Sequence, residues 1–352
     1  MIKYLVLGSL LLLTTACSEP EMKQLDRQQV AQQLKLHNEF LQPCESQVAI
    51  NEDLLVQSLP FTESYLIKRH AIYNSLRGLD LSPTEQKLAD YLTIAERFPA
   101  RYFPWPAHID VVEHMLHRDI SQPKIAEWVD FTAEQLTLGL QSKLKLNKIE
   151  LAALKAQLTA LEDREGFSSV LIESLDSLTR YLEDYTPRGS IGLHGLPNGG
   201  PWYQSKLNYF AGTTDAPLNW LVKVQNQFTK LEAQTLKLPV ELEHNHSLVE
   251  QWLGKQSMSL AKGLDWQQGY YNLPVTASRH IKQMSESDKA FWLTMMETDL
   301  GVHYHAWTSQ QAKVNLIKRL NISPQQAQFL VADIIFYPAF SFSFAPVLKM
   351  TN

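Results

Sequence analysis

The chain has 352 residues, a formal net charge of −5 and basic residues that are scattered rather than clustered. This charge distribution excludes the basic footprint that nucleic-acid binding requires. The length is sufficient for one large hydrophobic core or two fused lobes. Glycine is sparse, at 14 residues, and helical spacing of apolar residues dominates. We therefore expect an all-α, multi-helix fold.

The N-terminus resembles a bacterial lipoprotein signal. The apolar run from Tyr4 to Leu13 is too short to span a bilayer. It ends in Leu-Thr-Thr-Ala-Cys, which resembles a lipobox with Cys17 as the acylated residue. The alternative is a plain signal peptide, or a buried helix with a chance cysteine. On the lipoprotein interpretation, residues 1–16 are removed and residues 17–30 form a tether.

This interpretation predicts a location and a first partner. Several acyl chains on Cys17 would anchor the protein stably in a lipid bilayer. Ser18 after the cysteine resembles a sorting signal for the periplasmic face of the bacterial outer membrane. Only Cys44 then remains, so no intramolecular disulfide can form, and we expect this thiol to be buried.

The remaining chain, residues 31–352, is predicted to form a single all-helical domain, with two lobes meeting near 187–201 as the alternative arrangement. Leucines recur at helical spacing in two neighbouring stretches, and three sequences of the capping-box type start further helices. These helix signals are, in chain order, Ser82 to Glu85, residues 146–164, residues 168–185, Thr308 to Gln311 and Ser323 to Gln326. Proline- and glycine-rich connections are expected at 99–107, 187–201, 236–245 and 266–274.

Two histidine-rich stretches are candidate metal sites. In residues 108–117 (HIDVVEHMLH), His114 and His117 lie three residues apart beside Glu113, a spacing that can ligate zinc. A solvated helix face explains the same pattern, and we prefer it. Alternate histidines in Glu243 to His246 form a second candidate. We expect no metal and no cofactor at either stretch.

The segment from Gly195 to Tyr203 is the most specific local signal. Asn198-Gly199 predicts a tight turn with positive φ, and Thr213 or Thr214 with Asp215 is expected to cap a helix that begins near Pro217. The segment is either a substrate-facing loop whose amides bind an anion or a peptide backbone, or an elbow between two helices sealed by aromatic packing. Aromatic residues in the loops likewise either line a groove for a peptide or glycan or seal the helical core.

Together with a second segment, this stretch resembles a known family. The first segment reads Gly-Leu-Pro-Asn-Gly-Gly-Pro-Trp-Tyr and then Thr-Thr-Asp-Ala-Pro; the second reads Asp-Leu-Gly-Val-His, then Ala-Trp-Thr, a helix and Tyr-Pro-Ala. Both resemble the bacterial family numbered 885 among domains of unknown function, which contains helical, secreted or lipid-anchored, zinc-peptidase-like proteins. The positions that match the family in the second segment are Asp299, Gly301, His303, Trp307, Thr308, Ala312 and Pro338.

The chain departs from this family where its chemistry should lie. The resemblance implies a His-Glu pair, a nearby Pro-Gly-His and a later Glu-Gly-Trp-Ala that hold zinc, but the chain contains no His-Glu and no Glu-Gly-Trp. The family's C-terminal Arg, Tyr, Gly and Gln positions fall on Asp333, Ile334, Ala339 and Phe340. Without the phenol an oxyanion donor is missing, and His303 would be the relic of a transition-state-binding histidine.

These observations favour a non-catalytic binding or accessory protein, whose further partner would be a peptide or an envelope protein. The alternatives are a residual hydrolase with a metal site rebuilt from His303, His305 and His244 or His246, and a scaffold without a small ligand. We expect residues 196–203 and 303–307 to line one concavity, with Tyr203 and Trp202 toward a partly buried His303. The predicted binding residues are Asn198, Trp202, Tyr203, His303, His305 and Trp307.

Overall fold

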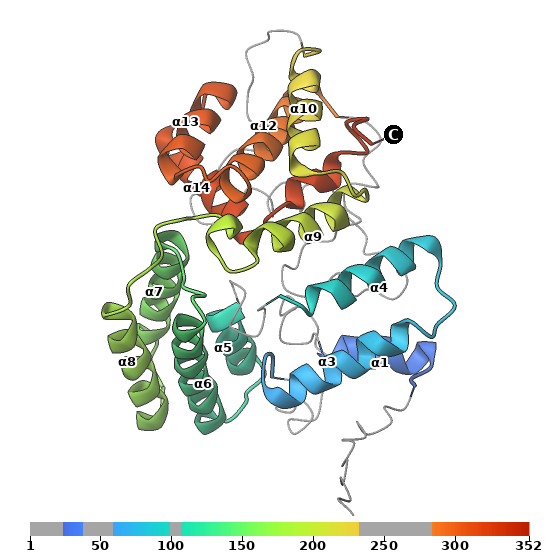
Figure 1. Ribbon diagram of the computed structural model, residues 1–352. Helices are drawn as coiled ribbons and strands as arrows, with labels where there is room; N and C mark the ends of the chain where they lie inside the picture. Colours follow the sequence, from blue (N-terminus) through green and yellow to red (C-terminus); the bar gives the residue numbers. More distant parts are fainter. Residues whose placement is uncertain (1–23, 38–58, 99–106, 232–283, 352) are drawn as a thin grey trace, which may run out of the picture.

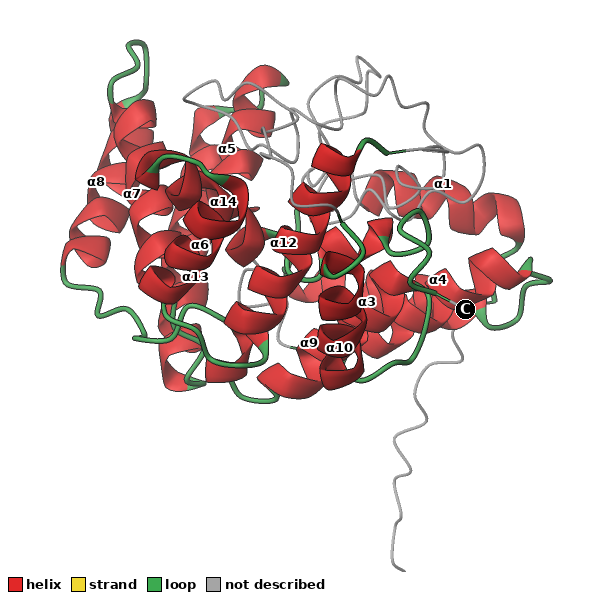
Figure 2. Ribbon diagram, turned by 90° about the horizontal axis from the view of Figure 1, so that it is seen from above, coloured by secondary structure: helices red, strands yellow, loops and turns green. Residues whose placement is uncertain are grey.

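The computed structural model describes residues 24–37, 59–98, 107–231 and 284–351. Within these ranges the chain forms twelve α-helices and two short 3₁₀ helices, and no strand (Figure 1, Figure 2). The predicted all-α fold is therefore confirmed. In the described ranges, no helix combines the length and apolarity that crossing a membrane requires. Cys17, Cys44 and the connections predicted at 236–245 and 266–274 lie outside them.

One group of helices packs around the leucine rows that the sequence predicts. The eight leucines at helical spacing in its last two helices are all buried in one hydrophobic cluster, so each helix turns a continuous apolar face to its neighbours. Asn147 caps the third helix in a capping box with Glu150, which the sequence reading missed. The four helices are α5 (Ala107–His117), α6 (Gln122–Gln141), α7 (Lys148–Glu162) and α8 (Ser169–Glu183).

A second, smaller group lies near the N-terminus. Its first helix starts at Arg27, inside the segment expected to be a tether, because Val30 and Leu34 find an apolar partner in the next helix. The predicted capping box of Ser82 and Glu85 is present. The three helices are α1 (Arg27–His37), α3 (Glu63–Leu76) and α4 (Pro83–Ala95).

The third group contains the C-terminal half of the described chain. Its long central helix is buried without interruption from Ala290 to His303, as expected for a helix surrounded by others. The capping boxes predicted at Thr308 and Ser323 are both present. The elements are η3 (Leu193–Gly195), α9 (Gly199–Ala211), α10 (Pro217–Phe228), α12 (Glu286–His303), α13 (Ser309–Leu320), α14 (Pro324–Phe336) and η6 (Phe340–Phe344).

Helix α9 lies at the centre of the molecule in Figure 1, between the other C-terminal helices above it and the two remaining groups below it, and packs against α4, η3 and η6. Helix α10 begins at Pro217 as predicted, but its N-cap is Ala216 and no side chain caps it. The Asp215 carboxylate is held instead by Thr213, at 3.0 Å, and by Lys223 one turn inside α10, at 2.8 Å. The predicted cap is therefore wrong, because an ion pair competes for the carboxylate.

Candidate functional site

The two sequence segments that resemble the family meet in the folded chain, where η3 and the start of α9 contact the end of α12. A Cβ atom on Gly192 would lie 1.9 Å from the carbonyl oxygen of Val302, and one on Gly199 would lie 1.7 Å from that of Leu193. Backbone atoms cannot rotate away as a side chain can. Both positions therefore require glycine for the close approach of two backbone segments.

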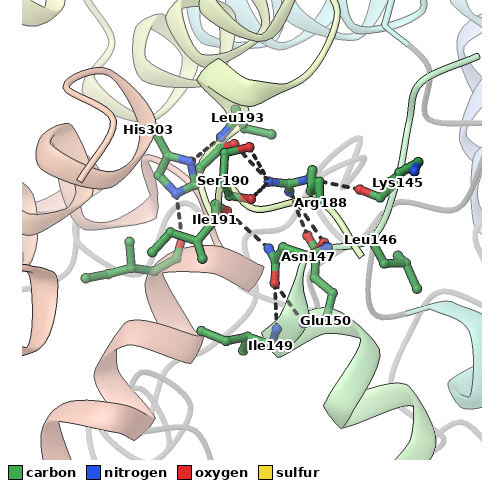
Figure 3. Close-up of polar contacts among 12 residues, drawn as sticks. Lys145, Leu146, Asn147, Ile149, Glu150, Arg188, Ser190, Ile191, Leu193 and His303 are labelled. Atoms are coloured by element: carbon green, nitrogen blue, oxygen red, sulfur yellow. Dashed lines mark hydrogen bonds and ion pairs between the residues drawn. The ribbon is translucent and has the colours of Figure 1, made fainter. Parts of the chain in front are cut away.

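His303 fastens this junction through both of its ring nitrogens (Figure 3). Its Nδ1 accepts a hydrogen bond from the backbone N–H of Leu193 at 3.1 Å, and its Nε2 lies 2.8 Å from the carbonyl oxygen of Ile334. Since Nδ1 accepts, the proton resides on Nε2 and is donated to Ile334. Burial lowers the pKa of His303 to about 3, so the ring is neutral. Neither nitrogen is left to hold a metal or an oxyanion.

A buried network of polar side chains continues from this histidine across three helices. The ring of Tyr203 on α9 stacks on His303 with centroids 5.3 Å apart, and its hydroxyl donates to the Asp299 carboxylate at 2.5 Å. The second oxygen of Asp299 accepts from the backbone N–H of Ala339 at 2.9 Å. Lys206, one turn beyond Tyr203, interacts with Asp299 and forms a hydrogen bond with Tyr91 on α4.

The buried surroundings shift the pKa values of the ionisable groups in this network. Burial raises the pKa of Asp299 to about 7, and the hydrogen bonds from Tyr203 and Ala339 and the charge of Lys206 oppose that rise. Burial also lowers the pKa of Lys206 and, with the nearby Asp299, raises that of Tyr203 well above its usual value. A lysine and an aspartate, both nearly inaccessible to solvent, therefore share one low-dielectric site beneath α9.

A second network holds the linker between α8 and α9 in place (Figure 3). The Nε of Arg188 donates to the carbonyl oxygen of Lys145 at 2.8 Å, and its Nη1 donates to those of Gly192, at 3.2 Å, and Ser190. Its Nη2 lies 3.4 Å from the carboxylate of Glu150. Arg188 thus ties the α5–α8 group to the linker that presents Leu193 to His303.

The predicted binding residues divide into buried and surface positions. Tyr203 and His303 meet as predicted, but His303 is fully rather than partly buried, and their contact is part of the core. The prediction that Trp202 faces His303 is wrong. Successive residues of a helix point about 100° apart, and the Trp202 ring stacks on Phe98 at 5.7 Å instead.

Two more of the predicted residues follow α12. His305 is exposed, with its ring against Tyr304. Trp307 lies over Gly301, where a Cβ would come within 2.2 Å of the indole carbons. The Asp-Leu-Gly-Val-His motif thus packs the end of α12: Asp299 and His303 make its polar contacts and Gly301 admits the tryptophan.

The accessible feature beside this core is a groove between α4 and α9. It has a volume of about 790 Å³, which lies within the range of small-molecule sites. Tyr91 and Tyr209 face each other across the helix contact, with ring centroids 4.0 Å apart. Asn198, which has the predicted positive φ of 56°, is one of the predicted binding residues and lines the groove. Side chains that line the groove include Tyr91, Ile94, Phe98, Gln204, Asn208 and Tyr209.

Sequence reasoning missed Lys206 and Tyr91. Lys206 could have been found from its spacing, because residues 203 and 206 are three apart and share one face of a helix. Nothing in the sequence links Tyr91 to α9, since their contact depends on how α4 packs on it.

The histidines of α5 divide: His117 is on the solvated face that was predicted, whereas the other two are not. His108 and His114 are buried, because the helix is covered on more sides than its valines and leucines suggested. Burial lowers the pKa of His108 to about 3. Glu113 instead pairs with Arg164, at 2.6 Å. Within the described ranges, no group of three or more His, Cys, Asp or Glu residues is arranged to hold a metal; the 243–246 candidate lies outside them.

Comparison with known proteins finds a related fold but no family. No protein-family model matches the sequence, and no curated protein matches it. One solved structure is similar, a protein from Colwellia psychrerythraea described as a putative lipoprotein. The superposition has a TM-score of 0.56 at 11% sequence identity and covers 92% of this chain and 91% of the other. At that identity the likeness concerns the fold.

Proposed function

We propose that this chain is a lipid-anchored protein of the bacterial envelope that binds a ligand in the groove between α4 and α9, without zinc-peptidase chemistry. The lipobox-like sequence that ends at Cys17 supports the anchor. The description of the Colwellia protein as a lipoprotein agrees with it. Ser18 supports the outer membrane, facing the periplasm, as its location.

The groove is the observation that carries the binding role. Its volume suits a small molecule or a short peptide segment, and it combines aromatic walls with a few amide and hydroxyl groups. The residues that resemble the family's motifs are occupied by packing: Asp299, Gly301 and His303 join α12 to its neighbours. Descent from the zinc-peptidase-like family accounts for this arrangement. The motif residues were kept for their packing contacts, and the metal site was lost.

The proposal is tested with the full-length purified chain in a thermal-shift screen against short peptides, fatty acids and cell-wall disaccharides. A ligand at about 100 times its Kd stabilises the folded state by about 2.7 kcal/mol. Thr214 is exposed and lines the groove, whereas Asn219 is exposed on α10 outside it. We expect at least one class to stabilise the wild type and the control variant Asn219→Trp, and Thr214→Trp to lose the effect. Stabilisation by no class, or equal stabilisation of both variants, would overturn the binding role.

A further inference from the structure

We propose that the groove selects organic anions, namely a carboxylate carried on an apolar body, with Tyr91 and the buried Lys206 as its charge-recognition end. This inference rests on the groove being the ligand site, as proposed above, and adds the chemical class of the ligand. Free carboxylates of this kind occur at the C-terminus of an apolar peptide and in a medium-chain fatty acid.

The walls of the groove suit an apolar body. Ile94 on α4, Phe98 just beyond the end of α4 and Pro201 on α9 line it, beside the stacked rings of Tyr91 and Tyr209. Burial of apolar surface against such walls stabilises a complex by roughly 25 cal/mol per Å² before the costs of association are subtracted. The body of the ligand would supply affinity, whereas its charge would supply selectivity.

The charge balance around the groove favours an anion. Lys87 and Arg97 line it, against the single acidic residue Asp90. Lys87 is already engaged, donating to the carbonyl oxygen of Gly212 at 3.3 Å across the groove. A hydrogen bond to a carbonyl does not neutralise an ammonium group, so the lining carries one more positive than negative charge.

Behind the wall, Lys206 contributes a further cation. Its hydrogen bond reaches Tyr91, which itself lines the groove. Asp299 is the counter-ion of Lys206, but Tyr203 and the Ala339 N–H also donate to that carboxylate. The negative charge of Asp299 is thus shared by three groups, namely Lys206, Tyr203 and the Ala339 N–H. A hydroxyl that interacts with a lysine cation is a stronger donor to a carboxylate than an isolated phenol.

Protonation of the same groups should make anion binding depend on pH. The groups that face Asp299 are Tyr203 and Lys206 from α9 and the N–H of Ala339; His303, stacked on Tyr203, is neutral. The pKa of Asp299 is raised to about 7, so lowering the pH from 8 to 6 neutralises it and leaves the Lys206 charge uncompensated. The lowered pKa of Lys206 acts with the same sign, because lower pH also keeps the amine charged. Anion binding should therefore tighten as the pH falls from 8 to 6.

The experiment measures binding to the full-length chain by calorimetry with two matched pairs of probes. The first pair is N-acetyl-Leu-Leu-Phe with a free carboxylate and the same peptide as its amide. The second pair is octanoate and octanamide. We expect each acid to bind about 10-fold more tightly than its amide, the scale of one hydrogen bond to a charged group. The pair with the tighter acid identifies the source of the carboxylate.

Two tyrosine variants test which hydroxyl group recognises the carboxylate. Tyr91→Phe keeps the ring and its stack but removes the hydroxyl, whereas Tyr209→Phe makes the same change on the opposite ring of the stack. Tyr91→Phe should abolish the preference for the acid, and Tyr209→Phe should keep it within about 2-fold. This design avoids changing Lys206, whose loss would leave Asp299 buried without its cation and threaten folding.

Equal binding of acid and amide, an equal effect of both variants, or an acid preference that weakens toward pH 6 would overturn the inference. If only neutral probes bind, the groove remains a ligand site and the anion selectivity is wrong. If none of the four probes binds at about 1 mM, where affinities of about −4 kcal/mol are still detectable, the selectivity is also wrong. The wider ligand screen then decides the binding role separately.

Discussion

The junction between η3 and α12 should fail when Gly192 is replaced by alanine. The added Cβ would lie 1.9 Å from the carbonyl oxygen of Val302. Reaching ordinary contact at about 3.4 Å requires the two backbone segments to separate by about 1.5 Å. Gly192 has φ of −87°, which alanine adopts without strain, so the whole effect comes from the clash.

The magnitude follows from the contacts that this separation breaks. The hydrogen bonds from Leu193 N–H to His303 Nδ1 and between His194 and Val302 are both 3.1 Å long, so an added 1.5 Å or so removes them. Leaving the buried His303 nitrogen unsatisfied costs about 2 kcal/mol, and loss of the more exposed bond costs about 1 kcal/mol. We expect a total of about 3 kcal/mol, or a fall in Tm of about 4 °C for a chain of this size.

Gly189 provides the matched control, since it lies in the same linker and its Cβ would meet no atom within 4 Å. Gly189→Ala should change the free energy of unfolding by no more than about 0.5 kcal/mol. Thermal melts compare the two variants, and amide hydrogen exchange at Leu193 should be faster in Gly192→Ala alone. Melting temperatures for the two variants within about 1 °C of each other would show that the close approach at Gly192 is not needed.

Three further outcomes are expected. Cys17→Ser should release the protein from the membrane fraction or leave an uncleaved precursor; normal cleavage with unchanged membrane fractionation would contradict lipidation. Elemental analysis of the purified mature protein should find well under one equivalent of zinc, and chelation should leave its Tm unchanged; a stoichiometric metal with a large chelator effect would favour a rebuilt metal site. Burial lowers the pKa of His37, His108 and His303 to about 3, so the stability they contribute is present above about pH 6.5 and is lost as pH falls from there toward 3. Asp299, whose pKa is raised to about 7, acts with the opposite sign and loses its contribution as pH rises through 7. Since the three histidines oppose only Asp299 and Glu150, whose pKa burial also raises, thermal melts should show Tm falling between pH 6 and pH 4; a constant or rising Tm would contradict these buried neutral histidines.

Local sequence signals predicted the helices well because their causes are local. The capping boxes at Ser82, Thr308 and Ser323 form within four residues, and an apolar stripe needs only the helical repeat of its own segment. The cap predicted at Asp215 was wrong because its cause is less local. The Asp215 carboxylate binds Lys223, which lies beyond the first turn of the helix.

The sequence alone determined that the chain is helical and where about half of the described helices begin, and it singled out two distant segments by their motif pattern. Only the tertiary structure decided what that pattern does. His303 has the chemistry of a ligand or a catalyst, but the backbone of Leu193 and Ile334 occupies both of its nitrogens. The groove likewise depends on α4 packing against α9, which brings Tyr91 to Lys206. Contacts between segments far apart in sequence decide which polar side chains are buried and which hydrogen-bond partners they have. Burial and hydrogen bonding in turn decide whether such a side chain can bind a ligand.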